Sequence, residues 1–100
     1  MIRHIVFFRL ADDIPADQRT DMLKEVKLKL EALPALIPEI LSLEIGINFA
    51  FDPKAADLSL LSKFDDRNAL HTYQVHPAHK AFMEWNRNKC PKFSVVDYEF

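Results

Sequence analysis

The pattern of side chains predicts four β-strands, at residues 2–10, 41–48, 58–64 and 93–100. Side chains alternate between the two faces in residues 2–10 and 41–48, and residues 93–100 are rich in β-branched and aromatic residues. In the first segment, Val6 and Phe8 lie on one face of the strand, while Ile5 and Phe7 lie on the other. Both faces of this strand therefore carry large apolar side chains, and both need a covering layer.

A helix is predicted between the first two strands, because apolar positions recur there every three or four residues. Pro15 suits the first turn of such a helix, and Asp17 suits its positive end. The inward stripe consists of Met22, Leu23, Val26, Leu30 and Leu33. Pro34 and Pro38 end the helix, so that residues 35–39 form a short connector.

A second helical region follows the third strand, and a proline divides it. Asp65 or Asp66 caps its beginning. Pro77 lacks an N–H group and restricts His76 before it, so it ends one helix and starts another over residues 77–88. The inward side chains are Ala69, Leu70 and Tyr73 before the break, and Ala78, Phe82 and Trp85 after it.

The order of strand, helix, two strands, divided helix and strand is that of the ferredoxin-like βαββαβ sandwich, an α+β fold. We expect one domain over residues 1–100, with an antiparallel four-stranded sheet that carries its helices on one face. The last strand, like the first, is apolar on both faces, and one layer of helices cannot cover both sides. A monomer would leave a large apolar patch in water, so we expect a homodimer.

Composition and charge limit the kinds of binding partner and the cellular compartment that we expect for this chain. The net charge is −2 and no basic stripe occurs, so we expect no nucleic-acid partner. The apolar run at residues 5–8 is far shorter than the ~20 residues of a membrane span, and we expect no membrane partner. A single cysteine, Cys90, fits a reducing, cytoplasmic location. The only glycine is Gly46, which excludes a glycine-rich phosphate loop, and we expect no cofactor.

Four residues make a candidate site for a small ligand: His4, Tyr73, His76 and His79. Since Pro77 restarts the helix, His79 falls in the first turn, where the positive helix end disfavours an imidazolium. A neutral imidazole there can accept a proton from an acidic carbon, and Tyr73 can donate a hydrogen bond to the resulting enolate. His4 points from the face of the first strand that the helices cover.

Three of these candidates also have a purely structural explanation. Tyr73 has the helical spacing of a core residue, His4 fits a buried histidine with satisfied nitrogens, and His76 fits a helix cap or a turn. His71 lies near His76 and His79, but the proline break prevents one shared helical face for zinc ligands. We therefore expect no metal site.

Four stretches of the chain resemble the stress-responsive dimeric α/β-barrel family, often called Dabb. They are the first strand MIRHIVFFRL, the segment of residues 35–46, the motif YQVHPAH at residues 73–79, and the ending VVDY at residues 95–98. The motif at residues 73–79 is the most specific of them. The resemblance implies a ferredoxin-like subunit and a homodimer in which two sheets face each other as a barrel.

The resemblance also implies a function for the candidate residues. Many bacterial members have no assigned reaction, whereas a plant polyketide cyclase of the family closes a linear polyketide by an aldol reaction. Its catalytic tyrosine and histidine match Tyr73 and His79, and a first-strand histidine near its pocket matches His4. A further pocket histidine of that enzyme matches Leu58.

Two functions are therefore predicted. The first is a homodimeric, stress-response-type protein with a pocket for a small aromatic or polyketide-like ligand and no assigned reaction. In that case His4, Tyr73, His76 and His79 bind the ligand. The alternative is a cofactor-independent enzyme of the polyketide-cyclase type, with His79 as the catalytic base and Tyr73 as its partner. A cavity that reaches Tyr73 and His79 while their polar atoms remain free favours the enzyme.

Overall fold

A computed structural model describes all residues from Met1 to Phe100. The elements are β1 (Ile2–Arg9), α1 (Ala16–Glu31), α2 (Leu33–Leu36), β2 (Ser42–Ile47), β3 (Leu58–Phe64), α3 (Arg67–Val75), α4 (Pro77–Asn86) and β4 (Lys92–Glu99). This order confirms the predicted βαββαβ arrangement. None of the helices is long and apolar enough to cross a membrane.

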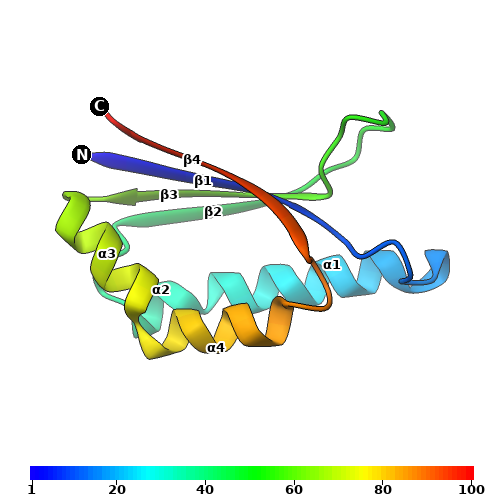
Figure 1. Cartoon of the computed structure of the whole chain (residues 1–100), viewed down its shortest axis with the longest axis horizontal. Helices are drawn as coiled ribbons and strands as arrows, with labels where there is room; N and C mark the ends of the chain where they lie inside the picture. Colours follow the sequence, from blue (N-terminus) through cyan, green and yellow to red (C-terminus); the bar gives the residue numbers. More distant parts are fainter.

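The four strands form one antiparallel sheet in the order β2-β3-β1-β4, which is the ferredoxin-like topology. All helices lie in a second layer against one face of this sheet, and the opposite face is left without cover (Figure 1). β1 occupies a central position, with His4 opposite Ser62 of β3 and opposite Asp97 of β4. The register therefore decides which side chains share the helix-covered face with His4.

The hydrophobic core fills the space between the sheet and the helices. Three of its side chains are completely buried: Val26 of α1, Phe64 of β3, and Ile37, which follows α2. They come from the apolar stripe of a helix, a connector and a strand, as the alternating and helical periods predict. The core is continuous beneath β1, β2 and β3, whereas every residue of β4 is exposed in the single chain.

The structure corrects the predicted connector after the first helix. α1 ends at Glu31, and Leu33 and Pro34 belong to a separate short helix, α2. Pro34 lies in the first turn of α2, where its missing N–H leaves no hydrogen bond unmade. It therefore starts a helical turn as well as preventing the continuation of α1. Of the two aspartates that the sequence offers as the cap of α3, Asp66 is the one that caps it: its side chain accepts the N–H of Ala69.

The uncovered face of the sheet, which we call the outer face, is apolar at its centre. Phe7 is 43% exposed, and Val96, Tyr98 and Phe100 are exposed to a similar degree. The chain exposes 6445 Å² in total, against roughly 5,800 Å² expected for a compact monomer of this mass. The excess surface and the exposed apolar side chains are typical of a chain that associates through this face.

Candidate functional site

The break between α3 and α4 brings Tyr73 and His79 together. Pro77 cannot donate a backbone hydrogen bond, and His76 caps the new helix by accepting the N–H of Ala78 on its Nδ1 at 3.0 Å. The chain changes direction at this point, so the last turn of α3 meets the first turn of α4. The ring centroids of Tyr73 and His79 are 4.4 Å apart.

The hydrogen bond of His79 selects its tautomer. Its Nδ1 lies 3.1 Å from the carbonyl oxygen of Gln74, which has no other role than that of acceptor. Nδ1 therefore carries the proton, and Nε2 keeps a free lone pair. Burial lowers the pKa of His79 below its usual value, the bond to Gln74 opposes this change, and the nearby His4 reinforces it. His79 is consequently a neutral base near pH 7.

Tyr73 has the complementary protonation state. Burial, with a further contribution from the carboxylate of Asp97, raises the pKa of Tyr73 to about 12. The side chain is only 2% exposed, yet its hydroxyl makes no hydrogen bond within the chain. The hydroxyl oxygen keeps some contact with solvent, because the only completely buried side-chain N or O atom without a hydrogen-bond partner is Asn86 Oδ1. Tyr73 is therefore a protonated donor whose hydroxyl is available to a ligand.

A buried histidine–carboxylate pair completes the polar part of the site. His4 Nδ1 lies 2.5 Å from Asp97 Oδ1, across the β1–β4 ladder. The imidazole is almost fully buried, whereas the carboxylate is partly exposed. The His4 ring packs edge-on against Tyr73, with 5.8 Å between the centroids. Asp97 thus orients His4, whose Nε2 has no partner within the chain.

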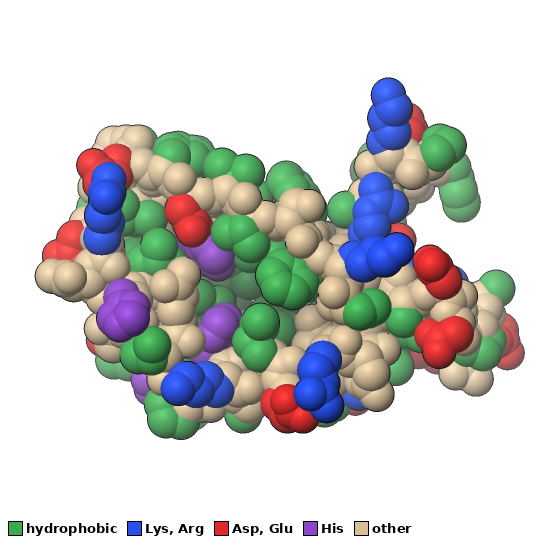
Figure 2. All heavy atoms as spheres, in the orientation of Figure 1, with side chains coloured by type: hydrophobic (Ala, Val, Ile, Leu, Met, Phe, Trp, Pro, Cys, Tyr) green, Lys and Arg blue, Asp and Glu red, His purple; other side chains and the backbone are tan.

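These side chains border a cavity of about 180 Å³ between the sheet and the helices. Its lining consists of His4, Val6, Phe8, Leu30, Leu60, Tyr73, Gln74, His79, Phe82, Met83, Phe93 and Val95. Figure 2 shows this hollow between the two layers, with histidine side chains at its border and hydrophobic side chains around it. A small number of polar groups in an otherwise apolar cavity is typical of a site for a small organic ligand.

The cavity continues into a wider groove of about 400 Å³ along α4. The groove shares Phe8, His79 and Phe93 with the cavity and extends to Cys90 and Asn86. Burial raises the pKa of the Cys90 thiol to about 11, so this cysteine is a thiol near neutral pH and a poor nucleophile. No group of three or more potential metal-ligating side chains occurs.

The structure brings together three of the four residues that the sequence singled out. His4, Tyr73 and His79 line the cavity, whereas His76 does not, because its ring is turned toward the N–H group that it caps. Sequence reasoning missed Asp97. Two signals could have found it: Asp97 interrupts an apolar strand, and the ferredoxin-like order places that strand beside the first one, which carries His4.

The lowered pKa of His79 predicts that its charge state affects stability. The folded chain binds fewer protons at this site than the unfolded chain, whose histidine has a pKa of about 6.5. The contribution of His79 to the free energy of unfolding is thus complete above this pH and is lost as the pH falls below it. In urea titrations at pH 8 and pH 5, His79→Gln should lose less stability on acidification than the wild-type chain. The exposed His71→Gln is the control and should behave like wild type; equal losses in all three proteins would contradict the prediction.

Comparison with known proteins identifies relatives over the whole chain. An uncharacterized protein of Streptomyces coelicolor is 36% identical over 103 residues, which cover all of both chains. A dimeric protein of unknown function from Bacteroides fragilis, with a ferredoxin-like fold, is 34% identical with a TM-score of 0.85. That comparison covers 99% of this chain and 95% of the other.

More distant structures show the same fold. A dimeric ferredoxin-like protein of unknown function from Thermobifida fusca is 26% identical, with a TM-score of 0.83 and coverage of 99% and 90% of the two chains. A hydroxynitrile lyase from Passiflora edulis has a TM-score of 0.80 at 18% identity, with coverage of 97% and 90%. The fold therefore occurs in at least one enzyme as well as in proteins without a known reaction. The fold alone does not indicate whether a protein that has it is an enzyme. The family model of the Stress responsive A/B Barrel Domain matches residues 2–100, and the chain belongs to this family, Dabb.

Proposed function

We propose that this chain forms a homodimer in which each subunit binds a small carbonyl compound and catalyses proton transfer beside the carbonyl group. The single observation that carries the proposal is the pair formed by His79 and Tyr73. One is a neutral base and the other a protonated acid, and both border the same apolar cavity. At neutral pH both groups therefore have the protonation states that enolate formation needs: a neutral imidazole to accept a proton, and a protonated phenol to donate a hydrogen bond.

The residues act in sequence on a ligand with an acidic α-carbon. Nε2 of His79 takes the proton from this carbon, and the electron pair of the C–H bond forms the enolate. The Tyr73 hydroxyl donates a hydrogen bond to the enolate oxygen, where the negative charge develops. The enolate carbon then adds to a second carbonyl of the same ligand, and the protonated His79 returns its proton to the new alkoxide. This is an aldol-type cyclisation that needs no cofactor.

His4 and Asp97 contribute orientation in this proposal. The carboxylate of Asp97 pairs with Nδ1 of His4 and fixes the ring, so that its other nitrogen, Nε2, is left without a partner in the chain. A polar group of the ligand can hydrogen-bond to His4 at the cavity. The cavity of about 180 Å³ is smaller than the roughly 300–1,000 Å³ of drug-sized pockets. We therefore infer a small aromatic body in the cavity, with a longer polyketide-like chain extending into the groove along α4.

Dimerisation is supported by two independent observations. The outer face exposes apolar side chains that the helices of the same chain cannot reach. The relatives from Bacteroides fragilis and Thermobifida fusca are described as dimeric proteins. An isologous pairing of two outer faces would give the dimeric α/β barrel.

Binding without a reaction is the second candidate, and Leu58 favours it. The family's plant polyketide cyclase has a pocket histidine at this position, whereas Leu58 is a core residue with 1% exposure. Leu58 does not border the cavity of this chain, so the polar contact that the cyclase histidine makes has no counterpart there. In this case the homodimer would hold an aromatic ligand and leave it unchanged, as the stress-response-type function predicts.

An exchange experiment distinguishes the two candidates. Acetophenone is a small aromatic ketone whose methyl protons exchange slowly with water. We expect the wild-type protein in D₂O to accelerate deuterium incorporation at this methyl group, measured by proton NMR. Val95→Trp, which fills the cavity from its exposed edge, should abolish both exchange and the NMR shifts caused by binding. If acetophenone binds but its methyl protons do not exchange faster, the enzyme is ruled out and ligand binding without a reaction is supported. If acetophenone neither binds nor exchanges faster, the proposal is overturned.

A further inference from the structure

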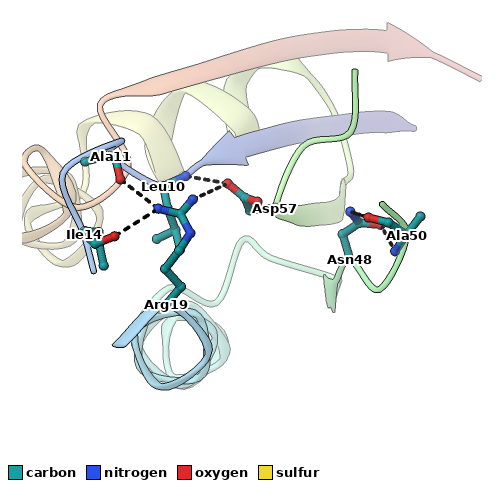
Figure 3. Close-up of polar contacts among 7 residues, drawn as sticks. All are labelled: Leu10, Ala11, Ile14, Arg19, Asn48, Ala50 and Asp57. Carbon is teal, nitrogen blue, oxygen red and sulfur yellow. Dashed lines mark hydrogen bonds and ion pairs between the residues drawn. The ribbon is translucent and has the colours of Figure 1, made fainter. Parts of the chain in front are cut away.

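The loop between β2 and β3, residues 48–57, is an ordered structure with its own hydrogen bonds. Asn48 both donates to the carbonyl of Ala50 and accepts its N–H, at 2.9 and 3.0 Å (Figure 3). Farther along, the Asp52 side chain accepts the N–H of Lys54 at 2.7 Å. The carbonyl of Asp52 accepts the N–H of Ala55. Such side-chain and turn bonds hold the loop in one conformation before any partner binds.

The base of the loop is fastened to the rest of the fold through Asp57. Its N–H donates to the carbonyl of Phe8, and its carboxylate accepts the N–H of Leu10 at 2.8 Å. The same carboxylate pairs with Arg19 of α1 at 3.6 Å, and Arg19 also donates to the carbonyl of Ala11 (Figure 3). The loop is therefore joined to both β1 and α1, and its direction is fixed.

This fastened loop carries two aromatic rings into solvent. Phe49 is 93% exposed, and Phe51 is fully exposed. The loop rises beyond the outer face of the sheet, on the side away from the helices (Figure 1). Large apolar side chains that are clustered and exposed mark an interaction surface, whereas single ones do not. Because these bonds hold the backbone of the loop, the main entropy cost of covering the rings is the rotamer freedom of the two side chains.

We propose that Phe49 and Phe51 pack on a second copy of this chain and extend the interface between the outer faces. The proposal rests on the homodimer described above. A groove of about 320 Å³ makes the loop and the outer face continuous, since it is lined by Phe7 of the face and by Phe49 and Ala55 of the loop. The loop therefore reaches past the plane at which a facing copy would lie. By two-fold symmetry, each subunit holds the other with its own loop.

The test compares the loop with an equally apolar surface on the other side of the molecule. In Phe49→Ser/Phe51→Ser, four rings leave the dimer interface, and the dimer dissociation constant should rise at least about 100-fold. Sedimentation velocity measures this constant, and circular dichroism checks that the fold is kept. The matched control is Leu28→Ser/Leu36→Ser, which removes two exposed leucines from the helix layer and should leave the constant unchanged.

A photo-crosslink then reports the contact directly. With p-benzoylphenylalanine in place of Phe51, irradiation should give a covalent dimer, and the same group in place of Leu36 should give none. Unchanged dissociation of the loop variant together with no crosslink from position 51 would overturn the role of the loop while leaving the homodimer in place. A wild-type chain that is monomeric at micromolar concentration would overturn both.

Discussion

Replacing His79 by alanine, or Tyr73 by phenylalanine, is expected to slow deuterium exchange into acetophenone by about 10²–10⁴-fold, the usual contribution of one acid–base or oxyanion group. The reason lies in the protonation states. His79 without its imidazole offers no base to the α-carbon, and Tyr73 without its hydroxyl offers no donor to the enolate oxygen. Because burial lowers the pKa of His79, the base form persists below pH 6.5, and the wild-type rate should decline only at more acidic pH.

Stability measurements separate this role from a structural one. The Tyr73 hydroxyl has no partner in the chain, so Tyr73→Phe should leave the melting temperature nearly unchanged. His71→Ala is the control for loss of an exposed histidine and should keep the full rate. If Tyr73 and His79 only fill the core, the wild-type protein will show no exchange to lose, and His79→Ala, which removes a ring packed on Tyr73, will only melt earlier.

The fold was predictable because its periods are local properties of the sequence. Alternation in residues 2–10 and 41–48 identified β1 and β2, and Pro77 marked the junction of α3 and α4. Pro34 was harder, because a proline that ends one helix also suits the first turn of the next. Local sequence does not distinguish these roles, whereas the packing of Leu33 into the core does.

The site was predictable only as far as the chain itself brings residues together. Tyr73 and His79 are six positions apart across one break, so local reasoning could pair them. His4 and Asp97 are separated by almost the whole chain and meet only through the register of β1 and β4. His76 belongs to the same motif, yet the need to cap α4 turns its ring away from the cavity. Strand register is a property of the folded chain, which is why the local sequence did not pair His4 with Asp97, whereas the cap by His76 is one of the structural roles that the sequence predicted.

Phe7→Asp should convert the proposed homodimer into monomers. Phe7 lies on β1 between Ser59 of β3 and Ser94 of β4, near the centre of the outer face, and it is 43% exposed in the single chain. Pairing two outer faces would remove the new carboxylate from water. A buried charge without a partner costs about 3–5 kcal/mol, and the cationic side chains of Arg9, Lys54 and Lys92, which border the same hollow as Phe7, offset part of this cost. Two copies of the substitution act in each dimer, so the dissociation constant should still rise by at least about 100-fold.

The fold of the subunit should survive this change, because Phe7 points away from the core that Val6 and Phe8 fill. Light scattering at micromolar concentration should therefore report a monomeric mass, with the circular dichroism of the wild-type chain. Leu28→Asp is the matched control, since it places the same charge on an exposed apolar position of α1, and it should remain dimeric. Dimers that persist in Phe7→Asp would show that the subunits associate through another surface. The apolar outer face would then need a different partner to cover it.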